Sequence, residues 1–174
     1  QEVINGYPFI SASDKAKSDN FGSSVEISAD GNTIIVGSPS ADPTLTDSGK
    51  VYIYVSGSNG WIEQKIYSNP FISASDKVKS DNFGSSVSIS SNGKRIAVGS
   101  PLSNISALDM GKVYTYYTTS SIAEKSYWYS QGGLNGDVNS LVLSGSDLYV
   151  GGEFTSNNNL SDSPTYKKVV KYTP

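Results

Sequence analysis

The sequence predicts an all-β protein built from repeated four-stranded antiparallel sheets. Segment 70–102 repeats segment 8–40 without a gap, at an offset of 62 residues, and 25 of the 33 aligned positions are identical. Inside each copy hydrophobic and polar residues alternate, which is the period of a strand with one buried face. Asp-Gly or Asn-Gly pairs separate the apolar runs, as in tight hairpins. We therefore expect each copy to be one structural unit that stacks against the next.

The first strand of the first unit contains Val25 and Ile27, which alternate with Ser24, Glu26 and Ser28. The second copy has Val and Ile at the same places but Ser88 instead of Glu26. This pattern predicts that Val25 and Ile27 are buried and that the variable position lies on the solvent face. The turn that follows contains Asp-Gly in one copy and Asn-Gly in the other, and both of its residues are expected to adopt positive φ angles.

Three further strands complete the predicted unit. An apolar run at 33–36, repeated at 95–98, suits a strand that is covered on both faces. The third strand is expected at 50–55 and 112–117, and the fourth at 61–66 in the first copy. No segment has a helical pattern.

Residues 118–174 do not follow the 62-residue period, but they contain the same succession of strand, turn and apolar strand. Strands are expected at 138–143, 148–152 and 167–172, with a polar surface loop at 155–165. We therefore divide the chain into residues 1–7, the outer strand of a preceding blade; 8–69, the first blade; 70–129, the second blade; and 130–174, a divergent and incomplete third blade. The chain starts with Gln1 and shows no leader, so we expect a processed mature form or a piece of a longer polypeptide.

Composition excludes several classes of function. Hydrophobic residues make up 36% of the chain and aromatic residues 11%, which disfavours a helical bundle. The formal net charge is −3, so neither nucleic acid nor an anionic membrane surface is an expected partner. No apolar stretch reaches the length of a membrane-spanning helix. The absence of both Cys and His removes the commonest nucleophiles, general bases and zinc ligands, so we expect neither catalysis nor a cofactor.

Two motifs occur in register in both copies. The sequence Asp19-Asn20-Phe21-Gly22 is followed by Val36-Gly37-Ser38-Pro39, and both motifs recur 62 residues later. The pair resembles the FG-GAP repeat of integrin-α-type β-propellers, with Ser in place of the Ala of the family name. The tail segment Gly151-Gly152-Glu153-Phe154-Thr155 is similar to a second propeller-type repeat with a GGxFT signature. The resemblance implies β-propeller-like blades of four antiparallel strands, of which this chain holds about 2.8, whereas complete rings hold about 4 to 8.

The motif residues are expected to have structural tasks. Gly22 and Gly37 would allow positive φ or close backbone approach, Phe21 would fill the space between blades, and Pro39 would end a strand.

The resemblance also raises the question of calcium, which some integrin-type blades hold in a D-x-D-x-D-G loop. The corresponding loops, 28–32 and 90–94, carry one carboxylate and none, too few for that cage. We therefore predict no metal site. Asp14 with Asp19, and Asp76 with Asp81, are an alternative oxygen cluster, but bonding to backbone amides of their own loops is the favoured interpretation.

Two weaker signals remain. Aromatic residues in the strands can be stacking platforms for sugars, although cross-strand packing explains their spacing better. These residues are Tyr52, Tyr54, Tyr114, Tyr116, Trp61, Tyr127, Trp128 and Tyr129. Asn104 and Asn159 fall in glycosylation sequons, which chance supplies in so polar a chain.

The leading hypothesis for function is a non-catalytic binding or adhesion module outside a cell, on its surface or on a virion, which contacts a protein or a glycan through blade loops. The alternative is a structural protein that self-associates by strand donation between open-ended blades. A hydrolase that uses paired carboxylates is the least favoured, since no pair is expected to share one cleft.

Overall fold

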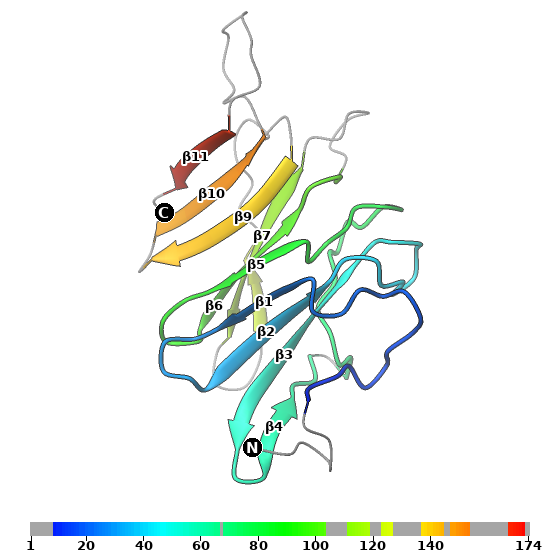
Figure 1. Cartoon of the computed structure of the whole chain (residues 1–174), viewed down its shortest axis with the longest axis vertical. Helices are drawn as coiled ribbons and strands as arrows, with labels where there is room; N and C mark the ends of the chain where they lie inside the picture. Colours follow the sequence, from blue (N-terminus) through cyan, green and yellow to red (C-terminus); the bar gives the residue numbers. More distant parts are fainter. Residues whose placement is uncertain are drawn as a thin grey trace, which may run out of the picture.

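The computed structural model of the chain is all-β (Figure 1), as the sequence predicted. It describes residues 9–66, 68–103, 111–118, 123–126, 137–144, 147–153 and 167–172. These residues form two four-stranded sheets and one three-stranded sheet, and contain no helix. Accordingly, the described part of the chain has no helix with the length and apolarity needed to cross a membrane.

The first blade is the sheet formed by the first repeat, and its strands pair in sequence order. All three pairings are antiparallel, as hairpin connections require. The central strands are covered on both faces, which explains their continuous apolar runs. The strands are β1 (Ser24–Ile27), β2 (Thr33–Ser38), β3 (Lys50–Gly57) and β4 (Gly60–Glu63).

The second blade repeats this sheet with the same order and register. Ile34 pairs with Tyr54 in the first blade, and Ile96 pairs with Tyr116 in the second, 62 residues on. The duplication is therefore present in the structure as well as in the sequence. The strands are β5 (Ser86–Ile89), β6 (Arg95–Ser100), β7 (Lys112–Thr118) and β8 (Ala123–Ser126).

The third sheet contains β9 (Asp137–Ser144), β10 (Asp147–Glu153) and β11 (Lys167–Tyr172), in the order β11-β10-β9. All three strands were predicted, and β11 has the predicted bounds. Strand β9 contacts β5 and β6, so the third sheet covers part of the second blade. The polar loop predicted at 155–165 lies outside the described residues.

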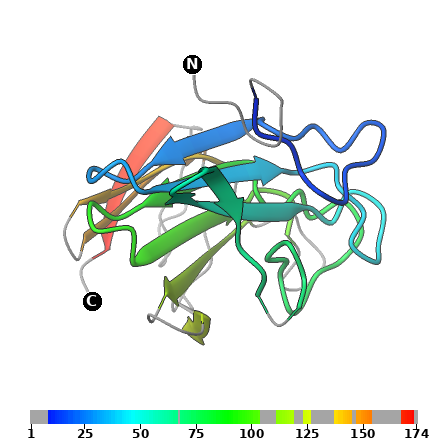
Figure 2. The ribbon, with the colours of Figure 1, turned by 90° about the horizontal axis from the view of Figure 1, so that it is seen from below.

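The two blades lie face to face (Figure 2), and their shared core is the largest in the described chain. Ile35, Val51 and Ile53 of the first blade pack against aliphatic and aromatic side chains of the second. The linker between the blades is part of this interface, because Val51 and Ile72 each donate a backbone hydrogen bond to the other, at 2.9 and 2.8 Å. Each blade thus seals an apolar flank of its neighbour.

The prediction for the solvent face of the first strand was wrong. Val25 and Ile27 are 60% and 51% exposed, whereas the Glu26 carboxylate accepts a hydrogen bond from the backbone N–H of Ile89. Ser88, at the equivalent position of the second copy, is fully buried. The reason is that the Glu26 side of the sheet faces the second blade, and no described residues cover the opposite side of β1.

The first turn is a hairpin, as predicted. It is longer than the expected two-residue turn, and only one of the two residues expected to have a positive φ angle has one. Only Gly31 has a positive φ, of 70°, and Gly93 repeats it at 69°. Ser28 donates from its backbone N–H to Thr33 O, so the loop spans the residues between them. The Asp30 carboxylate accepts a hydrogen bond from Asn32 N and thereby closes the turn.

The structural tasks predicted for the glycines and the prolines are confirmed, but the task predicted for Phe21 is not. Gly22 has φ of 91°, and a Cβ on Gly37 would collide with the backbone oxygen of Gly84 in the next blade. Phe21, which was predicted to fill the space between blades, is only partly buried, because no described residues of another blade cover that side of the first blade. Its copy Phe83 is completely buried in the core between the two blades. Both β2 and β6 end immediately before the prolines. Residues 1–7, predicted to be an outer strand, lie outside the described residues, and the proposed domain boundaries stay predictions.

Candidate functional site: the loop rim

Three loops lie at one end of the sheets (Figure 1) and are here called the loop rim, defined as residues 11–20, 39–49 and 73–82. The first two loops are joined by the side chains of Asn20 and Ser40, whose Nδ2 and Oγ atoms lie 3.0 Å apart. The second and third are joined by backbone hydrogen bonds from Ser80 N to Thr46 O and from Asn82 N to Asp47 O, at 2.9 and 3.0 Å. The rim therefore crosses the boundary between the two blades.

Asp14 fastens the first loop to the third strand of its own blade. Its carboxylate accepts hydrogen bonds from Lys50 Nζ at 3.0 Å and from the Tyr52 hydroxyl at 2.8 Å. Burial, with the hydrogen bond to Asp14, raises the pKa of Tyr52 far above its usual value. The phenol therefore stays protonated and remains a donor. Lys50 Nζ also lies 4.8 Å from the centre of the Phe71 ring, a cation–π contact that holds the ammonium in place.

The second copy repeats this arrangement with Asp76, Lys112 and Tyr114, at 2.9 and 2.8 Å. Burial raises the pKa of Asp76, but the hydrogen bonds from Lys112 and Tyr114 outweigh it and hold that pKa below its usual value. Asp76 is the more exposed carboxylate, since 47% of its side chain is accessible against 30% for Asp14. The same three residues thus clamp a loop in both blades.

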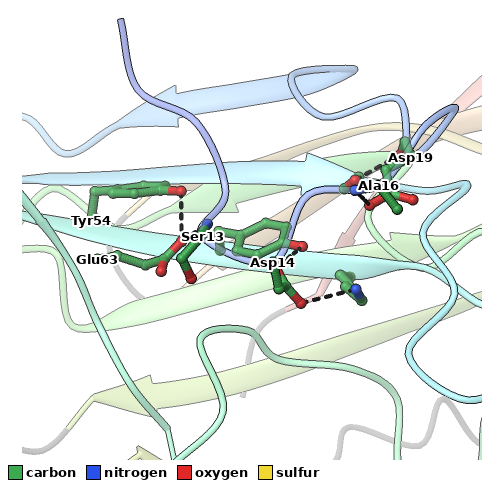
Figure 3. Close-up of polar contacts among 9 residues, drawn as sticks. Ser13, Asp14, Ala16, Asp19, Tyr54 and Glu63 are labelled. Atoms are coloured by element: carbon green, nitrogen blue, oxygen red, sulfur yellow. Dashed lines mark hydrogen bonds and ion pairs between the residues drawn. The ribbon is translucent and has the colours of Figure 1, made fainter. Parts of the chain in front are cut away.

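Asp19 and Asp81 bind backbone amides of their own loops, as the favoured interpretation predicted. Asp19 Oδ2 accepts from Ala16 N at 2.9 Å (Figure 3), and Asp81 Oδ2 accepts from Val78 N at 2.6 Å. Burial raises the pKa of Asp81 against the lowering effect of the Val78 amide. The same interpretation was wrong about the main partners of Asp14 and Asp76, whose carboxylates accept hydrogen bonds from side chains of the third strand of their blades.

Glu63 on β4 supplies another anchor for the first loop (Figure 3). Its Oε1 atom accepts hydrogen bonds from Ser13 N at 3.2 Å and from the Tyr54 hydroxyl at 3.0 Å. Burial, with the neighbouring Glu63 carboxylate, raises the pKa of Tyr54 well above its usual value, so this donor also keeps its proton. The exposed loop is therefore fixed from two strands.

The loop between β1 and β2 has the hydrogen bonds of a turn. The Asp30 carboxylate accepts from the Ser28 hydroxyl and from Asn32 N, and these bonds hold its pKa below the usual value. Asn92 bonds Ser90 and Lys94 in the same way in the second copy, without a carboxylate. Within the described residues, no three acidic side chains gather in a group that could hold a metal ion.

The aromatic side chains serve packing, as favoured. Tyr52, Tyr54, Tyr114 and Tyr116 are at most 4% exposed, and Phe21 and Phe83 meet them edge to face. Trp61 packs against a buried cluster of the first blade, formed by Ala12, Val36, Tyr52 and Tyr54. The four tyrosine rings considered as stacking platforms for sugars are therefore not on the surface, whereas Trp61 is partly buried. Tyr127, Trp128 and Tyr129 lie outside the described residues, as do the sequon residues Asn104 and Asn159.

Sequence reasoning missed two features. The Lys50–Asp14 ion pair joins residues 36 positions apart, and only the recurrence of the same Asp and Lys at the same separation in the second copy hinted at it. Glu26 was assigned to solvent because its position varies, but its 2.7 Å bond to Ile89 N belongs to the blade interface. A difference between repeats can therefore mark a contact that only one repeat makes.

The fold and its clamped loops define a protein of propeller-type blade repeats, in which glycine, phenylalanine and buried tyrosines have structural roles. The FG-GAP repeat family model matches residues 9–54 and 71–116, which are more than half of the chain. The chain therefore belongs to the FG-GAP repeat family, as the resemblance implied. A search of the curated proteins finds no match.

Proposed function

We propose that this chain is a non-catalytic binding module of an extracellular, cell-surface or virion-surface protein, and that it recognises a protein ligand through the loop rim. FG-GAP repeats are typical of extracellular, generally non-enzymatic β-propeller proteins. The observation that carries the proposal is a pair of exposed aliphatic side chains on loops that hydrogen bonds join. Leu45 and Val78 are both 43% exposed, and their loops meet through the bond between Ser80 N and Thr46 O.

A surface of this kind suits a protein ligand for two reasons. Exposed aliphatic groups bind by burial of apolar area. Sugars are held by exposed aromatic faces, and the four tyrosines of β3 and β7 considered for this role (Tyr52, Tyr54, Tyr114 and Tyr116) are buried. The loops are also held in place before binding, by the Asp14 and Asp76 clamps, so that little conformational entropy is lost on association.

The test is a binding screen with the whole chain, against a panel of recombinant extracellular proteins and against a glycan array. We expect a protein to bind, and Leu45→Asp with Val78→Asp to weaken that binding at least about tenfold, because both apolar contacts are lost. Val142→Asp is the matched control, since Val142 is exposed on the third sheet, away from the rim. Signal on glycans alone, no signal on any protein, or equal loss in the control variant would contradict the proposal.

The alternative function, assembly by strand donation, stays a prediction. The third sheet has three strands in the described part of the chain, and the residues that would donate or accept a further strand lie outside it.

A further inference from the structure

Two turns of the chain contain the same tripeptide, Ser-Asn-Gly, in different surroundings. Residues 58–60 join β3 to β4 in the first blade, and residues 91–93 lie between β5 and β6 in the second. An asparagine followed by glycine is prone to deamidation, because glycine has no side chain to hinder attack of its backbone nitrogen on the asparagine carboxamide. The pair of turns therefore shows how the fold acts on one reaction. Two further Asn-Gly pairs, at 5–6 and 135–136, lie outside the described residues.

The turn of the second blade holds Asn92 in place. Its Oδ1 atom accepts hydrogen bonds from the Ser90 hydroxyl at 2.9 Å and from Lys94 N at 3.1 Å, which direct the carboxamide oxygen toward these donors. The attacking atom is also engaged, because Gly93 N donates to Ser90 O at 2.8 Å. Ring closure at Asn92 therefore requires that the hydrogen bonds of this turn open together.

The first blade restricts the same turn further. A Cβ atom on Gly93 would lie 2.8 Å from Thr33 Oγ1 and 3.8 Å from Ser28 Cβ, and both of these residues belong to the first blade. The backbone at Gly93 is thus packed against a neighbouring sheet. A ring formed between Asn92 and Gly93 would have to fit into this contact, so that blade packing opposes the reaction in addition to the hydrogen bonds.

The turn of the first blade is held much less firmly. It lies at the end of β3 opposite to the loop rim (Figure 1). Asn59 is exposed, and its side chain makes no hydrogen bond with any described residue. Gly60 pairs with Gly57 at the last position of the ladder, and β4 is a four-residue strand at the edge of its sheet. The end of such a ladder opens more readily than pairs inside a sheet, which frees Gly60 N for attack.

We propose that Asn59 is a site of spontaneous deamidation in the folded chain, and that the fold protects Asn92 from the same reaction. The backbone nitrogen of Gly60 loses its proton to solvent and attacks Cγ of Asn59, which closes a succinimide ring. The bond between Cγ and Nδ2 breaks, and the nitrogen takes a proton from solvent and leaves as ammonia. Water then adds to either carbonyl carbon of the ring and opens it. The product at position 59 is aspartate or isoaspartate, and each carries a negative charge that the asparagine lacked.

The test follows both turns in one sample of the whole chain. The folded protein is incubated at mildly alkaline pH and then digested with trypsin, which releases the two asparagines in separate peptides, 51–65 and 80–94. Tandem mass spectrometry gives the deamidated fraction at each position over time. We expect Asn59 to react at least about tenfold faster than Asn92, because the second turn opens more rarely. Equal rates, or a faster reaction at Asn92, would overturn the proposal.

Unfolding supplies the matched control, because the two tripeptides are identical. In concentrated urea the turns no longer exist, and we expect the two rates to agree within about twofold. A difference that persisted undiminished in urea would come from the neighbouring sequence and would contradict protection by the fold. The variant Asn59→Gln should abolish the mass increase in peptide 51–65, and a mass increase that remained there would show that another residue reacts.

A substitution in the second turn tests the protecting contacts directly. Ser90→Ala removes the hydroxyl that donates to Asn92 Oδ1 and accepts from Arg95 N. We expect deamidation at Asn92 to rise at least about threefold, while the rate at Asn59 in the same sample stays unchanged. A lower rate at Asn92 would show that the hydrogen bonds activate the carboxamide instead of restraining it, and the proposed protection would then be wrong. The comparison of the unsubstituted chain with and without urea tests the proposal even if this variant does not fold.

Discussion

The two blades have nearly the same sequence and strand register but differ in environment. Phe83 is fully buried between the blades, where it contacts Tyr114 with ring centres 5.3 Å apart. Phe21 makes the same 5.3 Å contact with Tyr52 but lies at a partly exposed surface. The contacts within a blade are therefore set by its own sequence, whereas burial is set by the neighbour. Equivalent substitutions in the two repeats measure how much of the stability comes from blade packing.

The largest effect is expected at the phenylalanines. Phe83→Ala leaves a cavity in the core between the blades and should lower the free energy of unfolding by about 3–5 kcal/mol. Phe21→Ala removes the same contacts with tyrosine but less buried area, so we expect about half that loss. Urea unfolding of both variants at neutral pH gives the comparison. Equal losses would show that the interface adds nothing to the contribution of Phe83.

The isoleucines of the first strands sharpen the comparison. Ile89→Ala should cost about 2–4 kcal/mol because the side chain is buried at the interface. Ile27→Ala should cost less than about 1 kcal/mol, because that side chain is half exposed. Thermal melting of the two variants at one pH and one protein concentration measures the difference. An Ile27→Ala variant as unstable as Ile89→Ala would mean that the side of β1 that carries Ile27 is covered in solution.

A third comparison tests the polar contact between the blades. Glu26→Ala removes the acceptor of Ile89 N and should cost about 1.5–3 kcal/mol, as for a hydrogen bond to a charged group. Glu26→Gln keeps an oxygen acceptor and should recover about half of that loss. Hydrogen exchange at Ile89 reports the contact directly. Unchanged hydrogen exchange at Ile89 in the Glu26→Ala variant would show that this hydrogen bond does not protect the Ile89 amide at the interface.

The smallest effect concerns pH. The pKa of Asp76 is lowered in the folded state, so its contribution to stability is present above the unfolded pKa, near 4, and is lost as the pH falls through the folded pKa. Asp76→Asn should therefore flatten the acid side of the stability profile, by less than about 0.5 kcal/mol because the half-exposed carboxylate is screened.

The matched variant is Asp81→Asn, whose effect has the opposite sign. The pKa of Asp81 is raised in the folded state, so this group favours folding more as the pH falls toward the unfolded pKa, and its removal should steepen the acid loss. Denaturant unfolding between about pH 3 and pH 6 covers both. Identical slopes for the two variants would contradict the assignment.

The sequence predicted the repeat, the sheets and the strand positions well because these depend on local periodicity and on turn residues. Strand β11 was predicted with its observed bounds, and β2 and β3 within two residues of theirs. The predicted burial of Val25 was wrong, because the alternation of apolar and polar residues shows which residues share a face of the strand but not which face meets another sheet.

The loop rim was beyond local reasoning for a similar reason. Its clamps join Asp14 to Lys50 and Asp76 to Lys112 across more than half of a repeat, and its boundary bonds use backbone atoms, for which side-chain identity is no guide. The turn carboxylate Asp30, in contrast, bonds residues two positions away, and its local role was within reach of the sequence.

The backbone bridge between Val51 and Ile72 has a consequence for folding. Segment 8–14 has the same seven residues as segment 70–76, so during refolding either segment can dock on β3. If segment 8–14 took the place of segment 70–76 in the bridge, the blades would pack in a non-native arrangement. Such an arrangement is a kinetic trap typical of tandem repeats. Glu26, Ile35 and Ile53 contact the second blade and lack identical copies, so they are among the residues that distinguish the correct arrangement from the exchanged one.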